Sequence, residues 1–476
     1  MPLEFYNTLS RAKEPFTPVV PGHVGIYMCG PTVYSEPHLG HARGPVVFDV
    51  LRNWLEHEGY LVRFVANVTD VGHLVDDADD GEDKLARRAQ LERLEPMEVA
   101  EKYFWAYFDA MAALGVRRPS IVPRASGHII EQQAMTAELV DRGKAYVRDG
   151  NVYFDVSAWP EYGELSGRDP AEQLEGTRVE VRSEKDDPRD FALWKRAEGG
   201  HIMRWPSPWG DGFPGWHIEC SVMSTKYLGD EFDIHGGGLD LVFPHHEAEL
   251  AQARAAGKGF ARYWLHWNMI TLQGEKMAKS KGHFVTLGEL FAEHDPLVVR
   301  FHLLRSHYRS VSDFSADGLA SSAAGLDRLR DTYLALSSGL EAGAADDAPF
   351  AEYRARFAAA MNDDLNTPQA IAVLFDAARE MNRELEAGAG AAYRRGAVAF
   401  LDEHLTGVLG VPAGRGVMDA APELLRGLVA LLLEERQRAR DGRDFARADL
   451  LRDRLGALGV SVEDTAEGSR WKLTRG

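Results

Sequence analysis

Four residues of this chain carry donor atoms that suit a single metal site. His245 and Glu249 are one helical turn apart, so both side chains can reach one ion. Cys29 ends the first apolar run, and Cys220 lies just before the second half of a predicted sheet. Two thiolates, an imidazole and a carboxylate suit Zn²⁺. Free cysteines are often small buried hydrophobes, and the residues alone leave that alternative open.

The segment His38-Leu39-Gly40-His41 has the residue types of a phosphate-binding corner. It lies between a predicted strand and a predicted helix, where the helix N-terminus offers free N–H groups and a positive dipole. The two imidazoles add donors that can follow charge on a phosphoryl group, and Gly40 lets a flat base approach the backbone. A surface loop with two histidines is the alternative explanation.

Three lysines, Lys276, Lys279 and Lys281, lie between Gly274 and Gly282. A mobile loop of this kind can clamp a triphosphate, although a charge run by itself is more often a solvated turn. We expect this loop and the histidine segment at the carboxyl ends of strands in two halves of one sheet. Such sheets bind nucleotides there, so the pair is more specific than either part.

Composition and charge restrict the class of protein. The 476 residues suggest about three domains, and 45% hydrophobic with 27% charged residues exclude a disordered, collagenous or coiled-coil chain. Two cysteines cannot form a disulfide framework, and the sequence shows neither a secretory signal nor an 18-residue apolar run. We therefore expect a cytoplasmic protein. A net charge of −19 argues against a general nucleic-acid coat, although residues 436–476 hold ten basic against seven acidic residues.

Strand and helix signals alternate in the N-terminal part of the chain. Apolar runs at 24–29 and 61–68 predict buried strands, and the helical spacing over 46–55 predicts a helix between them, which together indicate a parallel sheet. A long helical stretch at 83–114 should break near Pro96.

An inserted segment follows, with a hairpin at 145–156 around Asp149-Gly150 and Trp- and Pro-rich loops at 194–216. The second half of the sheet is predicted to contain a strand at 231–235, a tight glycine loop at 236–238, a helix at about 244–256 and a strand at 263–272.

The remainder of the chain is predicted to be mainly helical. The expected elements are helices over 286–336, a linker at 338–348, a helix at 351–385, a second linker at 411–421, and two helices with a terminal hairpin in the last ~55 residues.

These motifs resemble those of the class I aminoacyl-tRNA synthetases, and specifically the cysteinyl-tRNA synthetase family. HLGH is similar to the HIGH signature of that class, and KMAKS at 276–280 to KMSKS, with Ala278 in place of the usual serine. Segments similar to those of the cysteine family are CGPTVY at 29–34, SPWG at 207–210, GWHIECS at 215–221, FDIHGGGLDLVFPHHE at 232–247, DDLNTPQA at 363–370 and DFARADLLRDRL at 444–455. The resemblance spans essentially the whole chain.

The resemblance implies an α/β fold with a Rossmann-type parallel-sheet catalytic domain, a connective insertion, a helical bundle and a small C-terminal α+β domain. The implied boundaries are 1–120 for the first half of the catalytic domain, 121–214 for the connective insertion, 215–310 for the second half with its KMSKS-like loop, 311–410 for the helical bundle and 418–476 for the anticodon-binding domain.

The implied reaction has two steps. L-Cysteine attacks the α-phosphate of ATP, used with Mg²⁺, to give cysteinyl-adenylate and pyrophosphate. The acyl group then passes to the 3′-terminal adenosine of tRNA(Cys). One Zn²⁺ per chain, a monomeric state and no membrane partner complete what the resemblance implies.

The resemblance also assigns roles to individual residues. The implied zinc ligands are Cys29, Cys220, His245 and Glu249. His38 and His41 would stabilise the phosphates, Lys276 and Lys279 the departing pyrophosphate, and ATP would be bound by His38, Gly40, His41, Asp240 and Lys279. Thr69, Trp216 and His235 match positions of the cysteine pocket of the family, with a strand-end hydroxyl, a packed aromatic and a core histidine as the alternatives.

A metal site of this composition would separate cysteine from serine chemically. A thiol with a pKa of about 8.5 loses its proton on coordination, whereas a hydroxyl is a harder and far less acidic ligand. A small steric difference is worth only ~1–3 kcal/mol, so we expect selection on the metal without editing.

Three other functions share part of these features. A mycothiol-type cysteine ligase transfers cysteine to an amino sugar, and the segment from Met418 onward argues against it. A non-catalytic zinc-dependent RNA-binding protein would not need the histidines and lysines of both nucleotide motifs. A zinc hydrolase is disfavoured because four protein ligands leave no open position for water. That count also requires the cysteine thiolate to enter as a fifth ligand or to displace Glu249.

Overall fold

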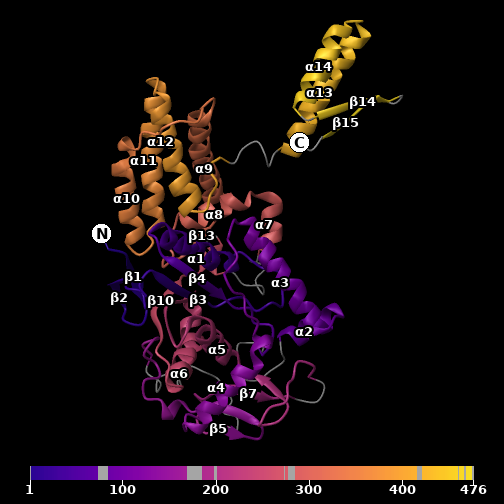
Figure 1. Cartoon of the computed structure of the whole chain (residues 1–476). Coiled ribbons are helices and arrows are strands. Elements are labelled where there is room, and N and C mark those ends of the chain that lie inside the picture. Colours follow the sequence, from indigo (N-terminus) through magenta and orange to yellow (C-terminus); the bar gives the residue numbers. More distant parts are fainter. Residues whose placement is uncertain are drawn as a thin grey trace. The chain divides into compact units, whose positions relative to one another are not determined.

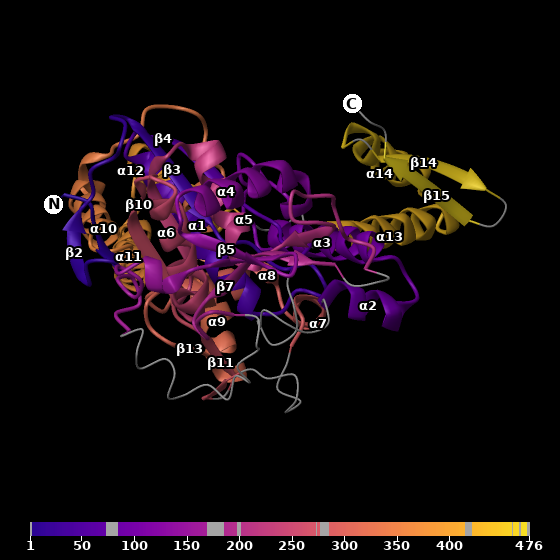
Figure 2. The ribbon, with the colours of Figure 1, turned by 90° about the horizontal axis from the view of Figure 1, so that it is seen from below.

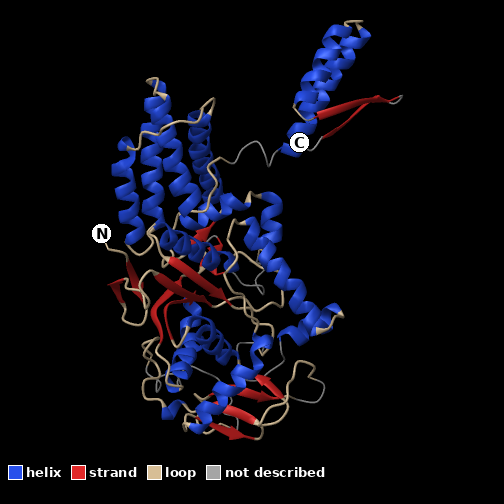
Figure 3. Cartoon of the chain, viewed as in Figure 1, coloured by secondary structure: helices blue, strands red, loops and turns tan. Residues whose placement is uncertain are grey.

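The computed structural model of the chain divides into two compact units, Met1–Ala413 and Gly414–Gly476. It describes residues 2–72, 84–168, 185–197, 201–272, 274–276, 285–414, 421–458, 460–465 and 468–473. The first unit contains the parallel sheet, the insertion and the helical bundle, and the second is a small helical and hairpin unit (Figures 1 and 3).

A four-stranded parallel sheet in the order β10-β9-β3-β4 is the centre of the first unit. Its strands are β3 (His23–Met28), β4 (Leu61–Ala66), β9 (Glu231–Gly238) and β10 (Phe260–Trp267), and α1 (Gly40–His57) connects β3 to β4. The strand, helix, strand alternation and the α/β fold class are confirmed. The pairing of β3 with β9 joins the two halves that the insertion separates in sequence.

Side chains along β3 alternate between two cores. Val24, Ile26 and Met28 belong to the core that includes α1, while Tyr27 and Cys29 belong to the core that includes α5 (Trp216–Leu228) and α6 (Glu247–Ala255). In Figure 1, α1 lies above the strands and α5 and α6 below them, and Figure 2 shows the same elements from below. The histidine segment, at the start of α1, therefore lies on one face of the sheet. The helices α5 and α6, which carry metal-ligand candidates, lie on the other.

The predicted glycine loop at 236–238 is wrong, because these residues form the carboxyl end of β9. A Cβ added to Gly236 would lie 1.9 Å from Phe48 Cζ, and one on Gly237 would lie 2.3 Å from His246 Cε1. Side chains from opposite faces approach the strand so closely that only glycine fits. The glycine run reflects close packing rather than a turn.

The predicted strand at 263–272 is two strands in different sheets. β10 ends at Trp267, and β11 (Ile270–Leu272) pairs instead with β12 (Glu275–Lys276) and β13 (Ser312–Phe314). The lysine segment thus begins in a small separate sheet and, contrary to the expectation from sequence, does not follow a strand of the parallel sheet.

The insertion contains a four-stranded antiparallel sheet in the order β5-β6-β7-β8 (Figure 3). Its hairpin of β5 (Ala145–Arg148) and β6 (Asn151–Phe154) confirms the predicted one. The loops predicted over 194–216 are wrong in part, because β7 (Phe191–Arg196) and β8 (Gly212–Pro214) extend that hairpin. The buried Trp194 explains why a tryptophan-rich stretch is strand here.

Helices make up most of the rest of the first unit. The break near Pro96 is confirmed, and the predicted helix at 351–385 is two helices, separated where Asp364 and Leu365 take positive φ of 59° and 52°. The helices are α2 (Lys84–Glu92), α3 (Pro96–Ala113), α4 (Ile129–Asp141), α7 (Leu287–Glu293), α8 (Pro296–Leu304), α9 (Ala316–Ser337), α10 (Ala351–Asn362), α11 (Thr367–Glu386) and α12 (Ala391–Leu401), and an N-terminal hairpin is formed by β1 (Glu4–Asn7) and β2 (Ala12–Pro15).

A buried ion pair links the helices that follow the parallel sheet to α1. Arg300 on α8 donates from Nη2 to Asp49 Oδ2 of α1 at 2.6 Å, from Nε to the Leu409 carbonyl at 2.8 Å and from Nη1 to the Leu114 carbonyl at 3.2 Å. Both charged side chains are buried, and each has several partners, as a buried charge requires.

The second unit has the predicted two helices and hairpin. These are α13 (Ala421–Asp441), α14 (Phe445–Ala457), β14 (Val460–Thr465) and β15 (Gly468–Leu473). Val429, Leu455 and Val460 form its small buried core. Among the described residues of the whole chain, no helix combines the length and apolarity needed to cross a membrane.

Replacing Gly236 by alanine is expected to destabilise the protein. The added Cβ has to displace the buried Phe48 ring, and overpacking of this kind costs about 1–3 kcal/mol of unfolding free energy. Urea denaturation of the full chain measures the loss. Gly288→Ala is the control, because an added Cβ there meets nothing within 4 Å, and an equal effect of both variants would contradict the packing argument.

Candidate active site

The four predicted metal ligands converge in a buried cluster, which we call the thiol cluster: Cys29, Cys220, His245 and Glu249. Their ligand atoms all lie within 4.8 Å of one another. The two Sγ atoms are 3.6 Å apart, Cys29 Sγ is 3.4 Å from Glu249 Oε1, and His245 Nε2 is 3.0 Å from the same oxygen. Cys29 follows β3, Cys220 lies on α5, and Glu249 lies on α6, so the sheet and two helices each contribute a ligand atom.

The thiol cluster fits a tetrahedral zinc ion. With Zn–S bonds of about 2.3 Å, two ligand sulfurs lie roughly 3.8 Å apart, close to the 3.6 Å between the two Sγ atoms. Two soft sulfurs, one imidazole and one carboxylate form a donor set that zinc prefers over Mg²⁺ or Ca²⁺. All four residues are buried, as in a structural or substrate-holding metal site.

Further side chains hold the ligands in place. His235 Nε2 lies 2.8 Å from Glu249 Oε2, and His217 Nδ1 lies 2.8 Å from His245 Nδ1. The Trp216 ring stacks on His245 with 4.2 Å between ring centroids. Metal ligands are commonly oriented by such outer contacts. The sequence interpretation placed Trp216 and His235 near the substrate and missed His217, which is three residues before Cys220 on α5.

His246 is a second residue that the sequence interpretation missed. Its Nε2 lies 3.3 Å from Cys29 Sγ, and its Nδ1 lies 2.7 Å from His266 Nε2. Cys29, His235, His246 and Glu249 form a second group with ligand atoms within 4.8 Å of one another. The signal was the double histidine before Glu247, since residues three and four positions before Glu249 both reach the same helix face.

Opposite charges compensate for burial in the thiol cluster. Burial raises the pKa of Glu249, but His235 and His245 outweigh it and hold that pKa well below its usual value. Burial lowers the pKa of His245, but Glu249 and Cys220 raise it to about 10. Burial raises the pKa of the Cys29 thiol well above its ordinary value. The Cys220 thiol is also buried, but its contacts with Cys29 and His245 lower its pKa, so it is the readier thiolate.

The histidine segment lies at the N-terminus of α1, as predicted. The His38 and His41 rings stack at 3.7 Å between centroids. Gly40 N–H donates to His38 Nδ1 at 3.1 Å, and His38 N–H donates to His41 Nδ1 at 3.2 Å. A neutral imidazole whose Nδ1 accepts carries its proton on Nε2, so both rings are set as N–H donors. Donors at a helix N-terminus suit a phosphate.

Backbone pairing brings the start of α7 beside the histidine segment. His38 and Thr286 form an antiparallel bridge, Leu39 N–H donates to the Val285 carbonyl at 3.2 Å, and Leu287 N–H donates to the Pro37 carbonyl at 2.8 Å. The histidine segment therefore adjoins residues 285–287, which follow the lysine motif in sequence. The backbone of Lys276 belongs to β12, while Lys279 lies outside the described residues.

Two further predicted residues, Asp240 and Thr69, follow the carboxyl ends of strands of the parallel sheet. Asp240 is exposed on a helical turn, Leu239–Leu241, directly after β9. Thr69 follows β4 and is buried, and its Oγ1 donates to Glu219 Oε2 at 2.8 Å. The sequence interpretation did not predict a role for Glu219.

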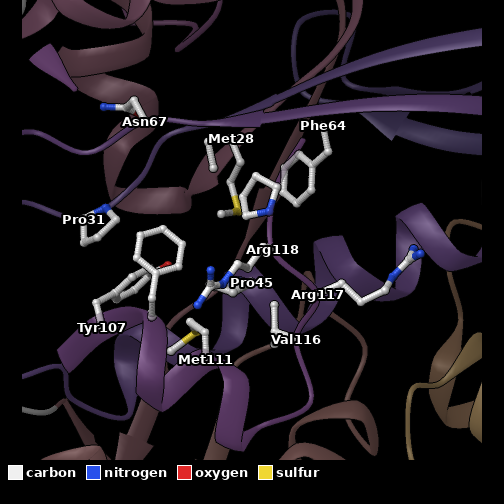
Figure 4. Close-up of a pocket in the computed structure, with 13 residues that line it drawn as sticks. Met28, Pro31, Pro45, Phe64, Asn67, Tyr107, Met111, Val116, Arg117 and Arg118 are labelled. Atoms are coloured by element: carbon white, nitrogen blue, oxygen red, sulfur yellow. The ribbon is translucent and has the colours of Figure 1, made fainter. Parts of the chain in front are cut away.

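A narrow apolar cavity lies between α3, α1 and the carboxyl ends of β3 and β4. Figure 4 shows Met28 and Asn67 on its upper side, Pro31 to the left, and Tyr107 and Met111 on its lower side. None of the predicted catalytic, ATP-binding, cysteine-pocket or metal residues is among its lining residues. This cavity is therefore not the site that the motifs predict.

Comparisons with known families match nearly the whole chain. The family model of the "tRNA synthetases class I (C) catalytic domain" matches residues 15–324, that of the "DALR domain" matches 356–413, and that of the "Cysteinyl-tRNA ligase anticodon binding domain" matches 425–471.

Proteins named cysteine–tRNA ligase are similar over the full length. One from Thermus thermophilus is 56% identical, with 100% of both chains covered. That of Deinococcus radiodurans is 54% identical, with 99% of this chain and 96% of its own covered. A solved structure of Mycobacterium tuberculosis methionyl-tRNA synthetase in complex with methionyl-adenylate covers 83% of this chain and 92% of its own at a TM-score of 0.60. At 16% identity that likeness shows the fold alone.

A buried arginine holds α1 against the segments around β11 and β13. Arg43 Nη1 donates to the carbonyls of Asn268 and Met269 at 3.1 and 2.9 Å, and Nη2 donates to those of His307 and Ser310 at 2.9 and 2.6 Å. The helix that carries His41 is thereby tied to the segments that directly precede β11 and β13.

Arg43→Met is expected to lower the free energy of unfolding by about 2–4 kcal/mol, because the hydrogen bonds from one buried guanidinium to four backbone carbonyls are lost. Urea denaturation measures the change. Arg63→Met is the matched control, since Arg63 is exposed and makes one long contact, 3.4 Å, to the Tyr227 carbonyl. Equal stability of the Arg43 variant and the control would show that the buried contacts contribute nothing.

Proposed function

The chain belongs to the cysteine–tRNA ligases, and from that membership we propose that it attaches L-cysteine to tRNA(Cys) as a cytoplasmic monomer, with one zinc ion selecting the cysteine sulfur. A tRNA, an amino acid and ATP are the partners of such an enzyme. The observation that carries the proposal is the thiol cluster, in which the only two cysteines of the chain meet a buried histidine and a buried glutamate.

The thiol cluster is the proposed zinc site. Cys29, Cys220, His245 and Glu249 would hold the ion, with His217 and His235 orienting the last two. When bound, zinc would hold the sulfur of cysteine as a thiolate, which a serine hydroxyl cannot match.

The proposed ATP site is the corner formed by the histidine segment and the lysine segment. His38 and His41 would donate from Nε2 to the phosphates, and the N-terminus of α1 adds its dipole. Gly40, Asp240, Lys276 and Lys279 complete the proposed contacts with ATP, its Mg²⁺ and the departing pyrophosphate.

Thr69, Trp216 and His235 are proposed to line the cysteine pocket. Trp216 stacks on His245 and His235 contacts Glu249, so both adjoin two of the proposed zinc ligands. Thr69 adjoins α5 through its hydrogen bond to Glu219. Trp216 as a packed aromatic and His235 as a core histidine are the alternatives. The pocket role is favoured because each of the two rings contacts a proposed zinc ligand.

We assign the catalytic domain to 1–120 and 215–310, the connective insertion to 121–214, the bundle to 311–410 and the anticodon-binding domain to 418–476. The family matches at 15–324, 356–413 and 425–471 support this division. The anticodon-binding match also argues for a tRNA acceptor rather than the amino sugar of the mycothiol-type ligases.

The primary test is ATP-dependent attachment of labelled cysteine to total tRNA, run beside cysteine-dependent pyrophosphate exchange. We expect both reactions, with charging confined to tRNA(Cys) in a purified set. Exchange without charging would move the acceptor to a small molecule. Absence of both reactions would contradict the proposed function.

Cys29→Ala is expected to lose stoichiometric zinc, because one of four ligands is removed, and to lose most of its discrimination between cysteine and serine in pyrophosphate exchange. Metal content per chain and the ratio of the two exchange rates are the measurements. The control is Ser221→Ala. Ser221 is a buried neighbour of Cys220 whose hydroxyl donates to Gln252 Oε1, and the variant should keep both the zinc content and the discrimination. Full discrimination in Cys29→Ala would refute the zinc proposal.

A further inference from the structure

Glu219 is a fully buried carboxyl group that has a donor for only one of its two oxygens. Its exposure is 0%, and Oε2 accepts the Thr69 hydroxyl at 2.8 Å. No described residue donates to Oε1, which is also shielded from solvent. A buried carboxylate oxygen without a donor is costly, so this oxygen requires an explanation.

The backbone around Gly72 adjoins that oxygen without donating to it. Gly72 has φ of +75°, and a Cβ there would lie 3.5 Å from Glu219 Oε1 and 2.5 Å from the Pro214 carbonyl oxygen. Any other residue would be strained and would crowd the oxygen. Within the described part of the chain, which ends here at Gly72, the backbone approaches Oε1 closely and donates no hydrogen bond to it.

The position of Glu219 relates it to the proposed substrate. It directly precedes Cys220, and it lies three residues after Trp216 on α5, so its side chain and the Trp216 ring are neighbours on one helix face. Trp216 stacks on His245 of the thiol cluster, and Thr69 is hydrogen-bonded to Glu219 itself. The carboxyl group thus adjoins two of the proposed cysteine-pocket residues and one zinc ligand.

We propose that Glu219 Oε1 accepts the α-ammonium group of the amino-acid substrate. The inference rests on the proposed binding of the cysteine sulfur at the thiol cluster. Only two carbon atoms separate the sulfur of cysteine from its nitrogen. When the substrate sulfur binds beside Cys220, its ammonium nitrogen is therefore within reach of Glu219. An ammonium group supplies the donor that Oε1 lacks, and a hydrogen bond from a charged donor is stronger than one between neutral groups. Glu219 then selects an α-amino acid, as the thiol cluster selects a thiol.

The test compares two thiols in equilibrium binding by calorimetry: L-cysteine, and 3-mercaptopropionate, which has the same thiol and carboxylate but no ammonium group. The zinc-loaded wild type should bind cysteine at least tenfold more tightly. In Glu219→Gln, whose amide repels an ammonium group where it presents N–H, this preference should fall about tenfold or more, mainly through weaker cysteine binding.

Glu247→Gln is the matched control, because Glu247 is an equally buried glutamate whose Oε2 accepts the Ser166 N–H at 2.7 Å, away from the proposed ammonium position. It should leave the preference unchanged. Zinc content per chain and the thermal midpoint are measured for every variant. Glu219→Asp, which keeps the charge but shortens the side chain, should also lower the preference and replaces the glutamine variant where that one does not fold.

The outcomes separate this inference from the proposed function. An unchanged preference in folded, zinc-loaded Glu219 variants would assign the residue to structure alone and overturn the inference. Equal binding of both thiols by the wild type would overturn it as well, while leaving cysteine activation intact. Failure of the zinc-loaded wild type to bind cysteine would instead overturn the proposed function.

Discussion

Successive side chains of a β-strand point to opposite faces of the sheet, and the arrangement of this site depends on that alternation along β3. Met28 faces α1, which begins at the histidine segment, and Cys29 faces α5 and α6, which carry the other thiol and the carboxylate. One residue of register shift would exchange the two faces and disperse the thiol cluster. The parallel pairing of β3 with β9 fixes that register and places Tyr27 beside His235 on the face that carries the thiol cluster.

Burial makes the thiol cluster sensitive to the loss of any partner. Glu249 and His245 are at most 2% exposed, and each relies on the other, and on His235 and Cys220, for its charge. Removing one member of such a set leaves a buried charge without a partner. The resulting loss of stability is larger than the small net stabilisation that the intact pair provides. The outer contacts of His217 and His235 follow from the same need, since a buried ligand must be oriented by protein groups rather than by water.

Residue types and local periodicity were sufficient to predict the α/β fold, the α1 corner, the insertion hairpin and the convergence of four ligand candidates. Errors arose where packing between distant segments decides the structure. A glycine run such as that at Gly236 is typical of a turn, and only the contact with Phe48 in the folded chain shows why glycine is needed there. The apolar run at 263–272 likewise gives no sign in sequence that its end pairs with β13. His217 and Glu219 were missed because their contacts, with His245 and Thr69, join residues 28 and 150 positions apart, for which sequence spacing gives little signal.

The composition of the site also indicates how it would separate substrates of nearly equal size. Cysteine and serine differ by one atom, and a pocket that measured only volume would gain ~1–3 kcal/mol. A thiolate-rich metal site distinguishes the atoms by softness and acidity instead. That chemistry needs a buried site in which the ligands are already ordered and water is excluded. A hydrated, flexible site would have to become ordered at each binding event. The 0–8% exposure of Cys29, Cys220, His245 and Glu249 meets this condition, so selection can reside in a single bond without a second editing site.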